Sequence, residues 1–396
     1  MKTQLTLLIA MMLTISQLSW AVVTDNGTCG DNVNYSIETT DGGDTYKVTI
    51  SGTGWMTEFD YYATPEPILP PWSEIRSKIT TVVIEEGVHS VGNHAFMECD
   101  LLSSLTLPAT LEKIGVLSFY HCISLPSVNL PEGFKWLDQA AFHYCTSLKS
   151  LVIPSTMTYI PSDGFSSCSN LESVTLPSTM TAIYYKGFSD CTKLSNLNIP
   201  ESVTFIGDMA FSDIAVPSVV IPGGVKEIGS GAFQRNPNLT QVVVVEGVEV
   251  IGGCAFGVCH NLETVVLPST LKRIDSHAFM AWQKLKDFYC YSAVPEMGSN
   301  LFEISYDEGH PDDMGGVTLH VPQSFIANYQ ATYPWSDFGS IVSLTSSDPK
   351  PTTVEDIYRS YKASTSEYYD LMGRRITTPV RGLYICNGQK VVVKGR

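Results

Sequence analysis

The chain has few charged residues, and among them positive charge is scarce. Only 16% of its 396 residues are charged, and 40 acidic side chains outweigh 24 basic ones. Because phosphate groups are bound by basic patches, this balance argues against nucleic acids and anionic membranes as partners. Beyond residues 1–23 no apolar run is long enough to span a bilayer, although 44% of the chain is hydrophobic. The composition predicts a folded, soluble body with no membrane span in the mature chain.

Familiar catalytic and ligand-binding motifs are missing as well. No Gly-x-Ser-x-Gly, phosphate-binding loop, His-Glu-x-x-His or EF-hand spacing occurs. His94 and His277 share one position of the repeat described below, but they are about 40 Å apart at ~4.8 Å per stacked strand, too far to hold one ligand. His121, His143 and His260 are predicted to be surface residues of the coils. We therefore predict no catalysis, no metal site and no cofactor.

The first residues have the pattern of a signal peptide. A lysine precedes an apolar stretch from Leu5 to Leu18, and Ser19-Trp20-Ala21 forms a small-x-small cleavage site. We expect residues 1–21 to be removed from a secreted or cell-surface protein. The alternatives are an N-terminal membrane anchor, for which no basic stop-transfer flank follows, and a lipoprotein, for which the first cysteine, Cys29, lies too far downstream.

A repeat of 23 residues, with one interval of 22, runs through most of the chain. Its unit reads Leu-x-x-Leu-x-Leu-Pro, about six residues, Ile-Gly, and then Ala-Phe-x-x-Cys-x-x-Leu. The alternating leucines predict a short strand with one buried face, which the proline ends. One unit cannot bury that face alone, so the units must stack in parallel into a solenoid. The phenylalanine column is Phe96, Phe119, Phe142, Phe165, Phe188, Phe211, Phe233, Phe256, Phe279 and Phe302.

Cysteine forms a second column, which stacking should turn into a ladder inside the coil. Neighbouring strands are close enough for disulfides, but parallel side chains are poorly placed to pair and five neighbours cannot all pair. A linear ladder also gives no tetrahedral metal cage. We therefore predict buried free thiols that act as small apolar residues. The members are Cys99, Cys122, Cys145, Cys168, Cys191 and Cys259.

The repeat unit resembles the BspA-like leucine-rich repeat family of surface proteins. The resemblance implies a leucine-rich-repeat-like right-handed coil, with a parallel β-sheet on one face, over residues 80–342 including a C-terminal cap. It also implies adhesion through an extracellular protein partner, either host matrix or another cell. Two other functions stay open, namely a carbohydrate or cell-wall binding module and an accessory domain of a secreted hydrolase.

The ends of the solenoid must be capped. In residues 22–79, alternating segments at Tyr35–Ile37 and Tyr46–Ile50 flank a glycine- and aspartate-rich turn, which predicts a hairpin in a β-rich cap together with Trp55 and Trp72. After the repeats, we expect a last strand, a short helix and a seal formed by Trp335 and Phe338.

The chain after the solenoid divides into a linker and a tail. Residues 343–354 are rich in Ser, Thr, Pro and Asp, which is typical of a linker. Residues 355–396 contain Asp370, Gly373-Arg374, Gly382-Leu383-Tyr384-Ile385 and a hairpin signal at Asn387-Gly388. This small β module resembles the C-terminal sorting domains of Bacteroidetes type IX secretion substrates.

Two surface features complete the sequence-based predictions. An insertion around residues 307–313 is acidic enough to hold Ca²⁺, but it has no recognised ligand spacing, so a solvated loop is the alternative. On the strands, one outward column changes from polar residues to an apolar stripe that we expect to be exposed and to bind the partner. The alternative is that β-branched residues simply suit strands. The stripe consists of Val220, Val243, Val266 and Tyr289.

Overall fold

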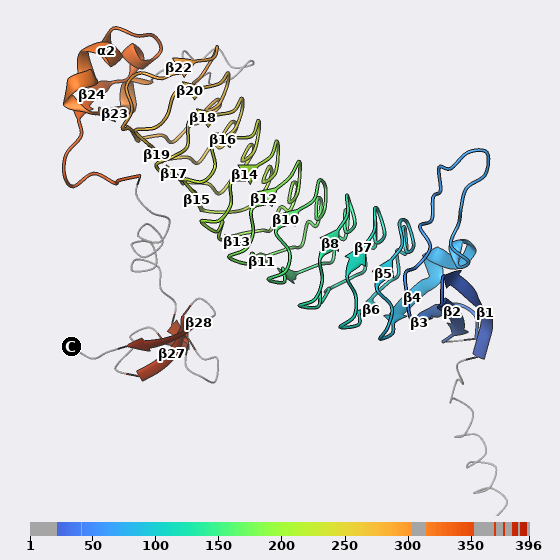
Figure 1. Ribbon diagram of the computed structural model, residues 1–396. Coiled ribbons are helices and arrows are strands. Elements are labelled where there is room, and N and C mark those ends of the chain that lie inside the picture. The colour runs from blue at the N-terminus through green and yellow to red at the C-terminus, as the bar shows by residue number, and fades with distance from the viewer. Residues whose placement is uncertain are drawn as a thin grey trace, which may run out of the picture.

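The computed structural model describes residues 22–40, 42–302 and 314–351, together with the backbone of four short tail strands. The predicted leader and the acidic insertion at 307–313 lie outside the described residues. Figure 1 shows the body as one elongated stack of coils between an N-terminal and a C-terminal cap. The predicted solenoid is confirmed, and its coils hold little helix.

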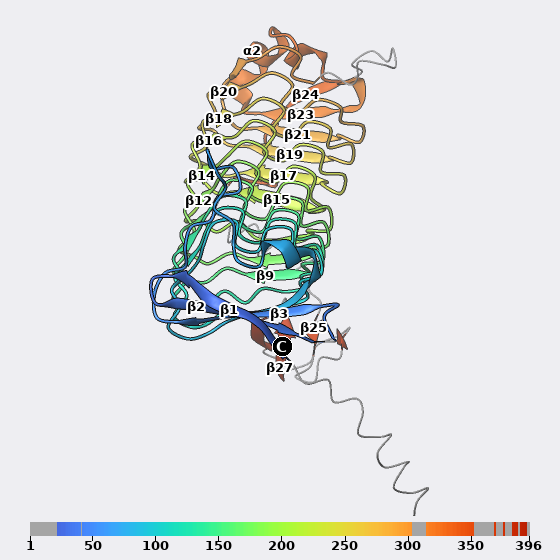
Figure 2. The same cartoon turned by 90° about the vertical axis from the view of Figure 1, so that its right-hand side faces the viewer.

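Most coils contribute a strand to what we call the first face, and these strands pair in parallel in three sheets, with breaks between β6 and β9 and between β13 and β15. In Figure 2 the later strands lie above one another as rungs. The register follows the repeat, because Val243 lies beside Val220 and beside Val266. The strands of the first face are β4 (Ile79–Ile84), β6 (Ser104–Thr106), β9 (Ser150–Val152), β11 (Ser173–Thr175), β13 (Asn196–Leu197), β15 (Ser218–Ile221), β17 (Gln241–Val244), β19 (Thr264–Leu267), β21 (Asp287–Cys290), β23 (Thr318–Val321) and β24 (Ser340–Ser343).

A second face, which the sequence analysis missed, carries another parallel ladder. Its strands are two residues long, too short for alternation to reveal them in a sequence. All but the last end in a buried residue, mostly isoleucine, such as Ile160 or Ile183. The strands are β5 (Ser90–Val91), β7 (Lys113–Ile114), β8 (Trp136–Leu137), β10 (Tyr159–Ile160), β12 (Ala182–Ile183), β14 (Phe205–Ile206), β16 (Glu227–Ile228), β18 (Val250–Ile251), β20 (Arg273–Ile274) and β22 (Glu296–Met297).

The phenylalanine column fills the core between the faces. Phe142 and Phe165 stack with centroids 5.6 Å apart and planes 1° apart, and the neighbouring pairs are similar. Two residues before and two after each Phe from Phe96 to Phe279, the backbone turns through positive φ, as at Ala140 (54°) and Tyr144 (62°). These turns return the chain to the next strand at the cost of a conformation that L-residues disfavour.

The N-terminal cap extends the first face. β1 (Val22–Gly30), β2 (Val33–Thr39) and β3 (Tyr46–Gly52) form an antiparallel sheet, and β3 then pairs in parallel with β4. The predicted hairpin is confirmed as β2–β3, whereas β1 was not predicted because its polar sequence lacks alternation. Immediately before the 3₁₀ helix η1 (Ser73–Lys78), buried Trp72 begins the column of rings, and its ring stacks on Phe96 at 5.1 Å.

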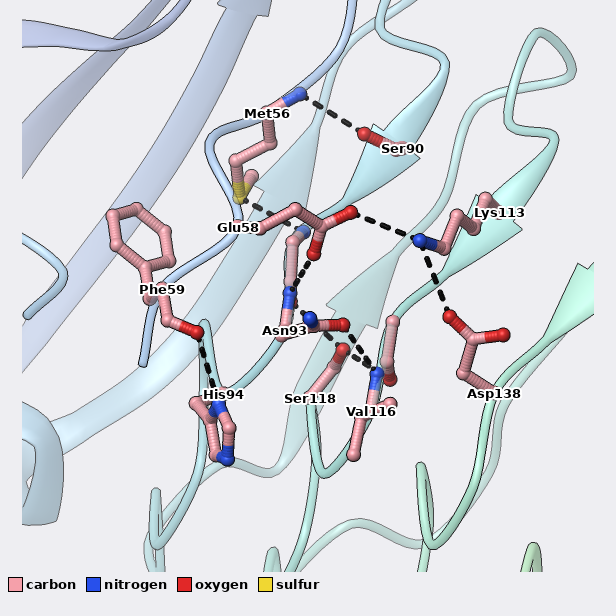
Figure 3. Close-up of polar contacts among 12 residues, drawn as sticks. Met56, Glu58, Phe59, Ser90, Asn93, His94, Lys113, Val116, Ser118 and Asp138 are labelled. Atoms are coloured by element: carbon pink, nitrogen blue, oxygen red, sulfur yellow. Dashed lines mark hydrogen bonds and ion pairs between the residues drawn. The ribbon is translucent and has the colours of Figure 1, made fainter. Parts of the chain in front are cut away.

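Polar contacts lock the cap onto the first coils (Figure 3). The Glu58 carboxylate pairs with Lys113 at 2.9 Å and accepts the Asn93 backbone N–H at 2.8 Å. Lys113 also pairs with Asp138 at 3.2 Å, so one lysine joins the cap to two coils.

The C-terminal cap has the predicted strand, helix and aromatic seal. β23 is followed by η3 (Gln323–Phe325), α2 (Ile326–Gln330) and η4 (Trp335–Asp337), while η2 (Met314–Gly316) precedes it. Trp335 and Phe338 are buried and meet Phe302 edge to face. In the tail, β25 (Tyr368–Tyr369), β26 (Arg375–Ile376), β27 (Gly382–Cys386) and β28 (Gln389–Val393) form a small sheet. Cys386 lies opposite Gln389, which is the pairing that the Asn387-Gly388 signal predicts.

Candidate binding surfaces

The outward column of the first face is open to solvent in its N-terminal half. Val152 stands 63% exposed at its centre. The other side chains of this half are polar, so the open region can offer hydrogen bonds along several coils. Its exposed members are Thr106, Asn129, Val152, Thr175 and Asn198.

The C-terminal half of the same column is covered, and here our prediction of an exposed stripe is wrong. The structure does bring the four stripe residues side by side on β15, β17, β19 and β21. However, Val220, Val243 and Val266 are only 4%, 3% and 0% exposed, and Tyr289 is partly buried. They form a separate apolar cluster with Val245 and Tyr291, outside the main core.

Part of the cover comes from residues 344–351, which we call the strap. After β24 this segment turns back toward β19 and β17 (Figure 1). The Tyr291 hydroxyl donates to the carbonyl of Pro349 at 3.0 Å, and the Glu246 N–H donates to the carbonyl of buried Pro351 at 3.1 Å. The strap therefore lies in the predicted linker, and two hydrogen bonds fix it to the sheet.

Tyr289 sits where the strap meets the last coils. Burial, followed by the nearby charges of Asp287 and Asp348, raises its pKa. Its ring stacks on His320 at 4.2 Å, and His320 pairs with Asp287 at 3.0 Å. The tyrosine is thus held as a neutral, ordered end to the stripe.

The cysteine column consists of free, buried thiols, as predicted, but they are not merely apolar fillers. The Cys145 thiol donates to the carbonyl of Phe119 at 3.3 Å, and Cys122, Cys168, Cys191 and Cys259 repeat this bond one coil apart. Where Asn236 replaces cysteine, its amide donates to the corresponding carbonyl of Phe211 at 3.2 Å. The column therefore supplies a donor to a buried carbonyl in each of these coils.

A polar cavity of about 500 Å³ lies between η1 and the first coils. Its charges are largely paired within it, because Arg76 contacts Glu98 at 3.0 Å and His121 contacts Asp100 at 3.0 Å. Within the described residues no group of His, Cys, Asp and Glu is arranged to hold a metal ion. In the same part of the chain, no helix has the length and apolar character needed to cross a membrane.

An exposed row of aromatic side chains, missed by the sequence analysis, lies on the second face. We call Trp136, Tyr159, Tyr184 and Phe205 the aromatic patch. Three of them are 41–47% exposed, and Tyr159 is half-buried. The ring of Tyr184 lies 5.8 Å from that of Tyr159 and 5.5 Å from that of Phe205. Trp136, Tyr159 and Phe205 each precede the buried residue of a two-residue strand, whereas Tyr184 follows Ile183, so no single column of the repeat contains all four.

The fold is that of a leucine-rich-repeat-like solenoid. Residues 75–195 and 181–307 match the family model described as the BspA type leucine-rich repeat region, in six copies that span more than half of the chain. The chain therefore belongs to the BspA-type leucine-rich repeat family, as the resemblance implied.

Solved structures with a similar arrangement include three bacterial proteins. A leucine-rich repeat protein from Bacteroides ovatus is 20% identical, with a TM-score of 0.44 over 80% of this chain and 99% of that one. A leucine-rich cell surface protein from Faecalibacterium prausnitzii is 20% identical, with a TM-score of 0.35 over 84% and 97%. The pneumococcal vaccine antigen PcpA is 16% identical, with a TM-score of 0.32 over 82% and 99%. Among curated proteins, none matches this chain significantly.

Proposed function

We propose that this chain is displayed outside the cell and binds an extracellular protein through the first face, without catalysis. The observation that carries the proposal is the open N-terminal half of that face, where outward side chains from Thr106 to Asn198 are all exposed on a rigid stack of strands. Solenoids use such extended faces to bind partners. Membership of a family of surface proteins supports a role in interaction or adhesion.

Binding to a panel of purified extracellular matrix proteins and to intact cells tests this proposal. We expect saturable binding that falls when Val152→Lys and Thr175→Lys are introduced together, because both side chains are exposed and the fold stays intact. Lys193→Glu, at another exposed position, is the control. If the wild type, the double variant and the control bind equally well, the first face is not the binding site.

The stripe offers a second contact area for the same partner when the strap is displaced. Val220, Val243, Val266 and Tyr289 form the apolar centre that protein interfaces commonly have. A chain that ends after Ser343 lacks the strap, and we expect it to bind the partner more tightly than the full chain does. Equal or weaker binding by the shortened chain would show that the stripe contacts the strap and not the partner.

Export is proposed from the leader at 1–21 and the sorting-like module at 355–396. Deleting residues 369–396 in the native host should retain the protein in the periplasm. Protease treatment and surface labelling of whole cells measure the amount of protein at the cell surface. Unchanged surface labelling of the deletion variant would show that the tail is not needed for sorting.

A further inference from the structure

The aromatic patch is a row of exposed rings along the second face of the solenoid. Single exposed apolar residues are normal on proteins, but neighbouring ones that touch mark contact sites. Phe205 has no hydroxyl to hydrate and yet stands 47% exposed, with its ring against that of Tyr184. Over Trp136 the Lys135 ammonium lies 5.4 Å from the ring centroid, whereas the exposed rings of Tyr184 and Phe205 contact other rings of the patch. The patch is therefore presented to solvent by the fold.

The geometry of the patch follows the period of the coils. Trp136, Tyr159 and Phe205 occupy the same position of their coils, and in the coil between the last two that position is buried Ala182. Tyr184 fills this gap from two residues further along, with its ring between those of Tyr159 and Phe205. The row extends over about 14 Å, three spacings of ~4.8 Å. A ligand that contacts the whole row must itself be elongated.

The borders of the patch carry hydroxyl groups, and the exposed Glu227 of the next coil lies beside Phe205. Thr158, Thr181 and Thr204 precede the patch positions of three successive coils and are exposed. The Thr181 hydroxyl donates to the Thr158 carbonyl at 2.9 Å, which leaves its oxygen free to accept from a ligand. Beside Trp136, Lys135 is already paired with Glu112 at 2.7 Å. These borders suit an uncharged ligand that is rich in hydroxyl groups.

We propose that the aromatic patch binds a neutral polysaccharide. A chain of pyranose rings is elongated and presents apolar C–H faces for the aromatic rings, while the hydroxyl groups along its edges meet Thr158, Thr181 and Thr204. An acidic glycan would meet Glu227, and the two lysines at Trp136, Lys113 and Lys135, already pair with carboxylates. A protein partner would be offered only one narrow row of rings rather than a broad apolar centre. This site lies on a different face from the proposed protein site.

An array of neutral and acidic polysaccharides, probed with the full chain, tests the proposal. Xylan, β-glucan, mannan and cellulose oligosaccharides are the neutral probes, and polygalacturonate and heparin are the acidic ones. We expect retention of at least one neutral polysaccharide, unchanged in about 0.5 M salt because the contact is uncharged. The combined change Tyr184→Ala and Phe205→Ala should weaken binding about tenfold or more. Tyr62→Ala, which removes an exposed tyrosine of the N-terminal cap, should leave it unchanged.

The experiments distinguish failure of the polysaccharide proposal from failure of the proposed protein-binding site on the first face. Absence of binding to every neutral polysaccharide, binding that survives in the Tyr184 and Phe205 double variant, or binding to acidic polysaccharides alone would each overturn it. Thermal melting of both variants confirms that they are folded, which we expect because the altered side chains are exposed. Matrix-protein binding by the double variant reports on the first face independently.

Discussion

At the scale of single residues, the cysteine column shows that one position of the repeat carries two tasks. The thiol fills a small space between stacked coils, and it also donates to the carbonyl of a Phe in the preceding coil. Asn236 preserves the donor with a larger side chain, and its amide oxygen accepts the N–H of Ile214 at 2.8 Å as well. The sequence revealed the column but not its hydrogen bonds, because a spacing pattern does not show that a buried thiol or the amide of Asn236 donates to a carbonyl.

The ladder thiols should be inert in the native protein. Burial raises the pKa of Cys168 and of Cys259 to about 12, so almost no thiolate is present at neutral pH. In a Cys386→Ser background, we expect a maleimide to label only half-buried Cys254 slowly before denaturation. After denaturation, all nine remaining cysteines should react without a reductant. Mass spectrometry measures the labelling, and a Cys99–Cys122 or Cys145–Cys168 disulfide would contradict it.

His143 should make stability depend on pH. Burial is the main cause that lowers the pKa of His143, while Asp163 acts in the opposite direction. Since the folded-state pKa lies below the unfolded value of about 6.5, the unfolded chain binds the proton more readily. Stability should therefore be complete above about pH 6.5 and fall as the pH drops below it. The melting temperature should fall less in His143→Asn than in the wild type between about pH 7.5 and 5.5, whereas the exposed control His260→Asn should follow the wild type.

At the scale of elements, the strap provides part of the cover over the C-terminal half of the first face, while the N-terminal half stays open. β9, β11 and β13 present an open surface, while the outward valines of β15, β17 and β19 are buried, although all six strands come from the same repeat. The strands and their register could be predicted because the period of the repeat fixes them. The contact of the strap with the stripe could not be predicted. Pro349 and Pro351 bind residues that are 58 and 105 positions away, and no repeat relates these positions.

Lysine substitutions in the stripe should destabilise the protein, whereas the same substitutions in an exposed stripe would not. Val243→Lys with Val266→Lys places two charges at positions that are 3% and 0% exposed. Because lysine is poorly tolerated there, we expect the strap to detach and the free energy of unfolding to fall by about 2 to 3 kcal/mol.

The matched control is Asn129→Lys with Thr175→Lys in the open half, which should change stability by less than about 0.5 kcal/mol. Chemical denaturation measures the stability of both, and hydrogen exchange at residues 344–351 reports on the strap. Equal stability of the two double variants, with the strap still protected, would show that something other than these contacts holds it.

At the scale of the whole molecule, the solenoid is a stack whose two ends are closed by aromatic residues. Trp72 stacks on the first Phe at 5.1 Å, and at the other end Trp335 and Phe338 meet Phe302 edge to face instead of continuing the stack. The sequence predicted the C-terminal seal and placed Trp55 and Trp72 in the N-terminal cap, where Trp72 is buried but Trp55 is 47% exposed. It did not predict the second face or its aromatic patch, because two-residue strands carry no periodic signal of their own.

A stack of equivalent coils should tolerate the loss of one complete coil. Deleting residues 150–172 removes 23 residues, so Lys149 joins Ser173, the same position of the next unit, and Phe142 stacks on Phe188. Because stability in a solenoid is close to a sum over units and their interfaces, this variant should fold with only a modest decrease in melting temperature. Deleting residues 150–161 removes half a coil, which shifts every later Phe and Cys out of its column, and this variant should lose cooperative unfolding. Circular dichroism during heating measures both, and equally severe disruption by the two deletions would mean that the coils are less equivalent than their shared ladders indicate.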